Sequence, residues 1–134
     1  MTSNVVRNSH GPNHFGELIG LEFTTIENGV SHCQLVVAES HLNPHRVVHG
    51  GVLYSMVDTG MGGALFSSLD PGQRCATLEI KISYLHFVTA GTLSCNSTVI
   101  QKSRRFGFLQ SDVFNDDRLV ASATGTFTIL GGNR

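Results

Sequence analysis

Residues 49–72 read HGGVLYSMVDTGMGGALFSSLDPG, and this stretch decides the fold. Apolar side chains recur in it at three- and four-residue spacing from Val52 to Leu65, and no proline interrupts them before Pro71. The pattern predicts a helix of roughly 20 residues, about 30 Å long. Because this helix is apolar nearly all round, it has to be buried, most simply by a sheet that wraps around it.

The rest of the chain supplies strands for that sheet. Asn28-Gly29 predicts a hairpin turn between residues 15–26 and 30–38. After the helix, turn residues separate four more expected strands, at 76–88, 93–101, 106–114 and 119–130. In the last of these, one face is expected to carry Leu119, Ala121, Ala123, Gly125, Phe127 and Ile129. The order predicts an α+β domain: an antiparallel sheet curled around one central helix.

Length and composition fit a single domain. The 134 residues suffice to bury a core without staples, so we expect a flexible tail at 1–14 and one domain at 15–134. Charged residues make up only 14 % of the chain, which favours a homo-oligomer that hides part of its surface. A net charge of −1 without a basic run argues against a nucleic-acid partner.

The cysteines and the apolar segments indicate in which compartment of the cell the protein works. Cys33, Cys75 and Cys95 are odd in number and widely spaced, so they predict buried thiols rather than a disulfide framework or a zinc site. The N-terminus lacks an apolar core of signal-peptide length, and no apolar stretch reaches the ~18 residues of a membrane span. We therefore expect a cytoplasmic protein that does not bind membranes.

Asp58 and the glycine pair before it are candidate site residues. An acid within an apolar helix is costly unless it is paired, protonated or chemically active. Asp58 therefore either meets a partner's donor or a local hydroxyl, such as Ser55 or Thr59, or acts as a nucleophile or general base. Gly50 and Gly51 allow a ligand close to the backbone, and the unpaired N–H groups of a helix start form an anion site.

A basic cluster and a set of regularly spaced histidines are two further candidate sites. Lys102, Arg104 and Arg105 form the only local basic cluster, which is either a solvated loop or a site for a phosphorylated ligand. Histidines 41, 45 and 49 stand four apart, as metal ligands on a helix would, but Pro44 breaks such a helix. We expect no metal site.

Three stretches together resemble one family. They are the segment from Asn43 through His49-Gly50-Gly51 to Asp58, the run Thr77-Leu-Glu-Ile-Lys-Ile-Ser-Tyr84-Leu, and the ending Leu119-Val-Ala-Ser-Ala-Thr-Gly-Thr-Phe. Over about residues 15–130 the chain is similar to the hotdog-fold acyl-CoA thioesterases, in particular the phenylacetyl-CoA thioesterase-like (PaaI-like) group. The resemblance implies hydrolysis of an acyl-CoA without a cofactor, in a homodimer that pairs into a dimer of dimers.

The resemblance also implies roles for single residues. Gly50 would offer its backbone N–H to the thioester oxygen, with Gly51 beside it in the substrate site. Asp58 would be the nucleophile or general base, and Asn43 would hold the thioester or the attacking water. Thr77 would orient water, and His49 would brace the turn rather than transfer protons. The alternatives are that Asn43 is a loop or capping residue and that Thr77 is an ordinary strand residue.

The spacing of Gly50 and Asp58 predicts where the site lies. Eight residues along one helix place their α carbons about 12 Å apart and about 80° around the axis. A short aspartate cannot bridge that gap to a ~3 Å contact on the same carbonyl. If both act on one thioester, they come from two copies of the helix, and the site straddles a two-fold interface.

Two rival functions share the expected fold. A hotdog dehydratase or hydratase needs a histidine on the helix, and residues 59–64 after Asp58 contain none; His86-Phe87 matches a dehydratase motif only in part. A non-catalytic acyl-CoA-binding protein would have little reason to keep Asp58 together with Asn43. Measuring CoA release against ligand binding separates an enzyme from a binding protein.

Overall fold

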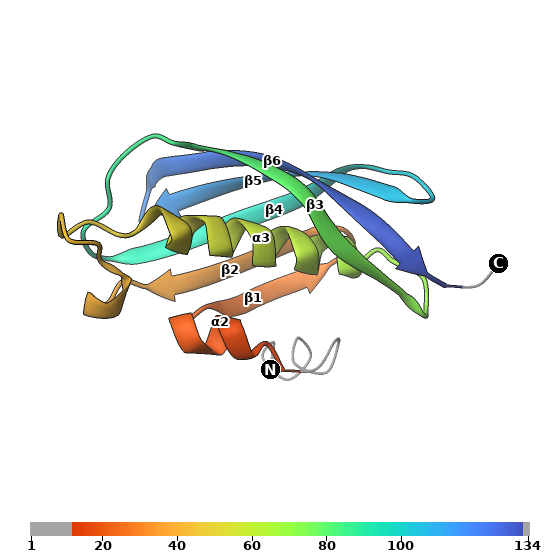
Figure 1. Cartoon of the computed structure of the whole chain (residues 1–134), viewed down its shortest axis with the longest axis horizontal. Helices are drawn as coiled ribbons and strands as arrows, with labels where there is room; N and C mark the ends of the chain where they lie inside the picture. The colour runs from red at the N-terminus through yellow and green to blue at the C-terminus, as the bar shows by residue number, and fades with distance from the viewer. Residues whose placement is uncertain (1–11, 133–134) are drawn as a thin grey trace.

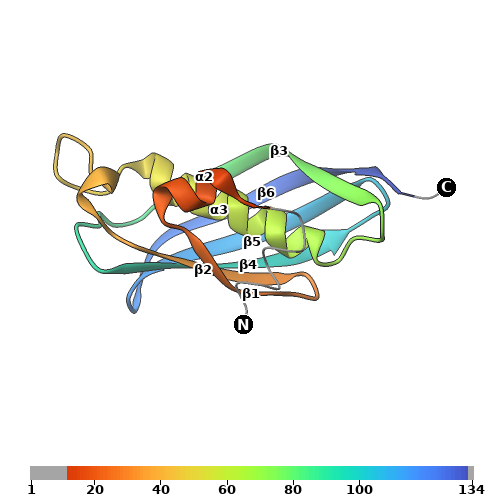
Figure 2. The same cartoon turned by 90° about the horizontal axis from the view of Figure 1, so that it is seen from below.

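The computed structural model describes residues 12–132, and these form one six-stranded antiparallel sheet curled around a central helix (Figures 1 and 2). The strands follow the order β1-β2-β4-β5-β6-β3 across the sheet. Their bounds are β1 Glu22–Glu27, β2 Val30–Val36, β3 Gln73–Tyr84, β4 Thr92–Lys102, β5 Phe106–Asn115 and β6 Arg118–Gly131. The expected α+β architecture is confirmed.

The central helix, α3, spans Gly50–Phe66 and contacts all six strands. Its fully buried side chains are apolar, among them Met56, Met61 and Leu65, as the periodic pattern predicts. The helix has 17 residues, somewhat fewer than the pattern predicted, and it ends well before Pro71. The hydroxyls of Ser67 and Ser68 turn back to the carbonyls of Ala64 and Leu65, at 2.7 and 2.9 Å, and compete for acceptors that another helical turn would use.

The segment before the first hairpin differs from the prediction. Residues 15–26 were expected to form the first arm of the hairpin, but His14–Ile19 form a short helix, α2. The Asn13 side chain caps its first turn, and Gly20 ends it in the left-handed conformation at φ 81°. The strand β1 therefore begins only at Glu22. Of the expected N-terminal tail, residues 1–11 lie outside the described residues.

One residue of the last strand faces away from the core, contrary to the prediction. A bulge in the β5–β6 pairing sets Val113 opposite Ala121 but Phe114 opposite Leu119. This shift leaves Leu119 36 % exposed and buries Val120 instead. The other five residues assigned to the inner face are buried, as expected.

The cysteines are free thiols, and two of them are buried. Cys33 on β2 stands directly opposite Cys95 on β4, beneath α3. A hydrogen bond with Cys95, followed by burial, raises the pKa of the Cys33 thiol. Cys75 is partly buried, and burial raises its pKa as well. Within residues 12–132, none of the helices is long and apolar enough to cross a membrane.

Candidate functional site

At the N-terminus of α3, the Gly50 amide hydrogen lacks an acceptor within the described part of the chain. His49 is the N-cap, and its Nδ1 accepts from the Gly51 N–H at 2.8 Å. The Val52 N–H donates to the His49 carbonyl at 2.9 Å. The Gly50 N–H has no acceptor among residues 12–132. Since Nδ1 of His49 accepts, its ring proton lies on Nε2, and the side chain holds the first turn of the helix.

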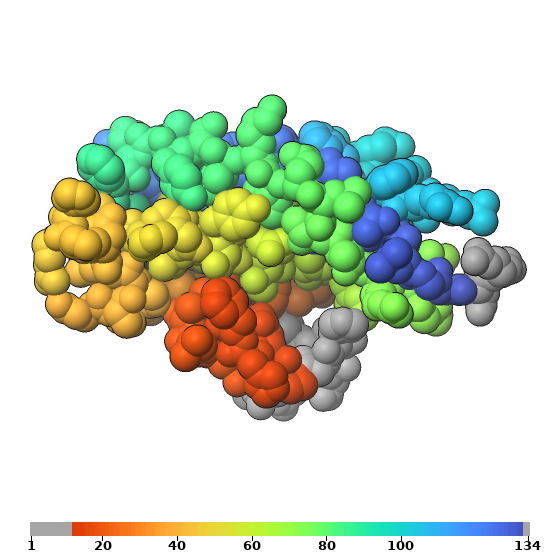
Figure 3. Space-filling model, in the orientation of Figure 1, coloured from red at the N-terminus to blue at the C-terminus, as the bar shows by residue number. Residues whose placement is uncertain are grey.

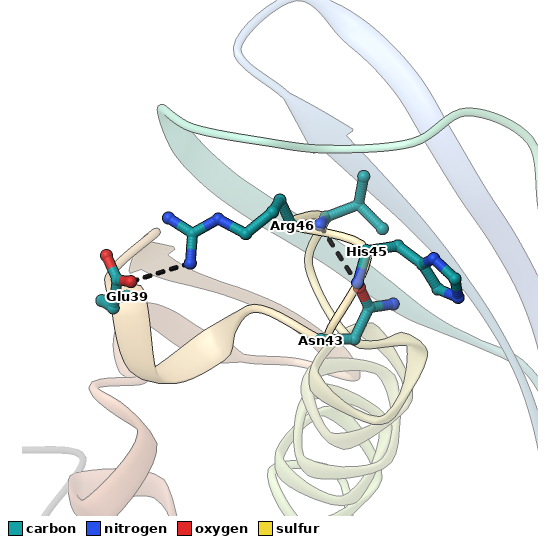
Figure 4. Close-up of polar contacts among 5 residues, drawn as sticks. Glu39, Asn43, His45 and Arg46 are labelled. Carbon is teal, nitrogen blue, oxygen red and sulfur yellow. Dashed lines mark hydrogen bonds and ion pairs between the residues drawn. The ribbon is translucent and has the colours of Figure 1, made fainter.

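Asn43 organises the loop that leads into this helix start (Figure 4). Its Oδ1 accepts the backbone N–H groups of His45 at 2.8 Å and Val47 at 3.4 Å. Arg46 takes a left-handed φ of 67° in this loop, and its guanidinium pairs with Glu39 at 2.8 Å. The loop role expected as the alternative for Asn43 is therefore present, and the amide Nδ2 remains available for a ligand.

His41 holds the same loop from behind, a role the sequence reasoning missed. Its Nδ1 accepts from the Ala38 N–H at 2.8 Å, so its Nε2–H donates to the Ile19 carbonyl at 2.7 Å. Its own carbonyl accepts from the His49 N–H at 2.8 Å. This buried histidine thus links the end of α2 to the residue that caps α3.

Asp58 meets a hydroxyl of the neighbouring edge strand. The Thr77 Oγ1 on β3 donates to the Asp58 Oδ1 at 2.6 Å. The donor is therefore neither Ser55 nor Thr59. The Ser55 hydroxyl donates instead to the Gly51 carbonyl at 2.7 Å. Asp58 is only partly buried, and its second oxygen accepts no hydrogen bond from residues 12–132.

Gly50 and Asp58 each contact the edge strand β3, through Tyr84 and Thr77. In Figure 3 the atoms of α3, yellow to yellow-green, reach the surface between β3 and α2. The helix is continuous from Gly50 to Phe66, so the two residues keep the separation of about 12 Å along the axis that the spacing predicted. Within one chain, the Gly50 amide and the Asp58 carboxylate are therefore two separate groups.

The basic cluster lies at the other end of the helix. The Lys102 Nζ donates to the Ser68 carbonyl at 2.6 Å, just beyond the C-terminus of α3. The side chains of Arg104 and Arg105 are exposed and make no ion pair within the described part of the chain. A single chain does not bring this cluster to Gly50.

Tyr84 at the end of β3 is a contact that sequence reasoning did not assign. Its hydroxyl donates to the Gly50 carbonyl at 2.9 Å, across 34 residues of sequence. A β carbon added to Gly50 would stand 3.2 Å from the Tyr84 Cζ and Oη. The tyrosine ring therefore packs closely against position 50, and a β carbon there would crowd it.

Comparison with known proteins gives a consistent family. The sequence profile of the Thioesterase superfamily matches residues 45–122. A curated relative, 1,4-dihydroxy-2-naphthoyl-CoA hydrolase of Listeria monocytogenes, is 29 % identical over 63 % of this chain and 68 % of its own length.

Solved structures agree with that family. The conserved protein PA5202 of Pseudomonas aeruginosa superposes with a TM-score of 0.88 at 35 % identity, over 92 % of this chain and 98 % of its own. A variant of the phenylacetic acid degradation protein PaaI of Thermus thermophilus gives 0.81 at 26 %, over 87 % and 98 %. The profile match and these likenesses place the chain in the thioesterase superfamily, as a PaaI-like thioester hydrolase of the hotdog fold.

Proposed function

We propose that the protein hydrolyses the thioester of an aryl- or fatty-acyl-CoA. Water supplies the hydroxyl of the free acid, and CoA leaves as its thiol. The observation that carries the proposal is the Gly50 amide hydrogen at the start of α3, which no neighbouring group among the described residues binds. It stands at the positive end of a 17-residue helix.

The Gly50 N–H is the donor for the thioester oxygen, which becomes negative as the carbonyl is attacked. A fixed donor aimed at that developing charge lowers the barrier, and losing one such donor costs roughly 3 to 4 kcal/mol. The Asn43 Oδ1 is occupied by its loop, so its Nδ2–H is the group that holds the thioester or the attacking water. Gly51 keeps the backbone beside it open to the substrate.

Asp58 supplies the reactive carboxylate. The Thr77 hydroxyl holds one oxygen and leaves the other to attack the carbonyl or to take a proton from water. Attack gives an acyl–Asp58 anhydride that water then cleaves, whereas base catalysis adds water directly. A single turnover in ¹⁸O water separates the routes, because an anhydride cleaved at its aspartyl carbonyl carries the label into Asp58.

The complete site forms between two copies of the chain. Strand β3 is an edge of the sheet, and its Leu78 side chain is 56 % exposed. An open twelve-residue edge invites pairing with a second edge. A two-fold axis there would bring the Gly50 of one subunit toward the Asp58 of the other, and these dimers would pair further into a dimer of dimers. The free thiols support a cytoplasmic enzyme.

The first experiment is CoA release from an acyl-CoA panel. Asp58→Asn removes the ionised carboxylate without changing its shape, so kcat should fall about 10²-fold or more while acyl-CoA still binds. Asp70→Asn is the matched control, because that exposed aspartate lies beyond the end of α3. A folded Asp58→Asn protein with wild-type kcat would refute the assignment, and binding without CoA release by the wild type would leave only an acyl-CoA-binding protein.

A second experiment isolates the Gly50 donor. Gly50→Pro deletes the N–H at the first helical position, where proline is tolerated, and Gly50→Ala adds the same crowding against Tyr84 but keeps the N–H. The proline variant should lose about 10²-fold more kcat than the alanine variant. Mixed dimers of Gly50→Pro and Asp58→Asn subunits should regain activity, since one site then has both groups; verified mixed dimers without recovery would place the site in one chain.

A further inference from the structure

The Gly50–Gly51 peptide is held at both of its polar ends by side chains. The Gly50 carbonyl accepts from the Tyr84 hydroxyl at 2.9 Å. The Gly51 N–H, which belongs to the same planar peptide group, donates to the His49 Nδ1 at 2.8 Å. One clamp comes from the N-cap of α3 and the other from the edge strand β3, so the peptide plane cannot turn without breaking a hydrogen bond.

The neighbouring peptide carries the free donor. The His49 carbonyl accepts from the Val52 N–H at 2.9 Å, while the N–H of the same peptide is that of Gly50 and is unpaired among residues 12–132. Only the two backbone torsions of Gly50 separate this peptide from the clamped one. Glycine is the residue whose torsions vary most freely. Without the two hydrogen bonds to the Gly50–Gly51 peptide, the direction of the Gly50 N–H would therefore vary more.

We propose that Tyr84 is a positioning residue for thioester hydrolysis: its hydroxyl, acting with His49 on the Gly50–Gly51 peptide, fixes the direction of the Gly50 N–H. This inference rests on the proposed function. The hydroxyl acts through Gly50 and does not itself touch the thioester. Its effect belongs to the transition state, where the oxygen charge develops and the direction of the donor matters most.

Two further observations fit this role. The ring of Tyr84 lies 3.2 Å from the point where a β carbon at Gly50 would stand, so the tyrosine packs closely against the glycine. Burial, and next the neighbouring Tyr54, raise the pKa of the Tyr84 hydroxyl above its ordinary value. The hydroxyl therefore stays protonated, and able to donate, at any pH near neutrality.

The test is Tyr84→Phe, which keeps the ring and removes only the donor. With the acyl-CoA that the wild type hydrolyses fastest, kcat should fall about tenfold, while KM and the affinity for the matching CoA thioether change less than about twofold. The control is Tyr54→Phe, the only other tyrosine in the chain, whose hydroxyl makes no hydrogen bond within residues 12–132. It should keep wild-type kcat.

A double-mutant cycle asks whether Tyr84 acts on the same peptide as His49. Once His49→Ala has released the Gly51 N–H, removing the Tyr84 hydroxyl should lower kcat by less than it does in the wild type. A kcat within about twofold of the wild type in folded Tyr84→Phe, or the same loss in Tyr54→Phe, would overturn the inference. So would strictly multiplicative losses in the cycle.

The outcome also separates this inference from the proposed function. If the wild type releases no CoA, or if Asp58→Asn retains full turnover, the proposed function fails and the inference fails with it. If Asp58→Asn is inactive and Tyr84→Phe is fully active, only the positioning role is wrong. Thermal unfolding of each variant confirms that the kinetic change does not come from loss of folded protein.

Discussion

At the scale of one residue, Gly60 is where α3 packs against a group of buried serine hydroxyls in the core. The Ser31 hydroxyl donates to the Gly60 carbonyl at 2.6 Å, and the hydroxyls of Ser97 and Ser111 bond each other at 2.6 Å beneath it. A β carbon at position 60 would stand 2.7 Å from the Ser97 Oγ, in a region without free space. The absence of a side chain is therefore a packing requirement.

Gly60→Ala should lower the free energy of unfolding by about 1 to 3 kcal/mol, because the added methyl forces the helix away from the sheet. Gly62→Ala is the control within the same helix, since its β carbon meets only Phe127, at an ordinary 3.9 Å. It should gain about 0.5 to 1 kcal/mol from the better helix propensity of alanine. Urea unfolding measures both, and equal effects would contradict the packing argument.

Tyr84 should also make stability depend on alkaline pH. Its folded pKa is raised, first by burial and then by Tyr54, so the unfolded tyrosine ionises first as pH rises. The contribution is complete below about pH 10, the unfolded value, and is lost as pH rises through the folded pKa. Urea unfolding from neutral to alkaline pH should show a steeper fall for wild type than for Tyr84→Phe; parallel curves would contradict this.

At the scale of elements, the sequence predicted the helix and strands whose positions depend on neighbouring residues. The apolar spacing of α3 and the turn residues between strands placed the helix and five of the six strands close to their observed bounds. The short helix α2 was missed because its apolar residues also suit a strand, and its Asn13 cap is a brief signal. The bulge that turns Leu119 outward depends on cross-strand pairing, which one strand's sequence does not reveal.

In the candidate site, too, the contacts between neighbouring residues could be predicted from the local sequence and those between distant residues could not. His49 as a brace and Asn43 as a loop former follow from neighbouring residues, and the structure contains both contacts. The contact of Thr77 with Asp58 could be anticipated only through a family resemblance, since 19 residues separate the two. Tyr84 reaches Gly50 only because β3 folds back beside α3, so the sequence carried no separate signal for it.

The β4–β5 connection now yields a narrower prediction for CoA binding. Lys102 already bonds the Ser68 carbonyl just beyond the end of α3, so Lys102→Gln should act mainly on stability. Arg104 and Arg105 are free of ion pairs in the described part of the chain, and we propose that they meet the CoA phosphates. Arg104→Gln with Arg105→Gln should raise KM more than it lowers kcat, and less so at high salt. An unchanged KM at low ionic strength would mean that both residues are only solvated loop residues.

For the whole molecule, the open β3 edge predicts stability that depends on protein concentration. If two edges pair, mass action makes Tm rise by a few degrees over about two orders of magnitude in concentration. Leu78→Lys places a charge on this edge and should yield monomers with a constant, lower Tm. Leu18→Lys, at an 81 % exposed position on α2, is the control. Light scattering measures the mass, and a monomeric wild type with a constant Tm would refute the paired edge.

The contact of α3 with every strand has a consequence for hydrogen exchange. Met56, Val57, Met61 and Ala64 lie at the centre of the helix with no exposed surface, so their turns cannot fray while the sheet stays closed. Their amide hydrogens should exchange with deuterium only when the domain opens as one unit, whereas those of α2 exchange through local opening. The slowest amides of α3 would then report the free energy of global unfolding under native conditions, without any denaturant.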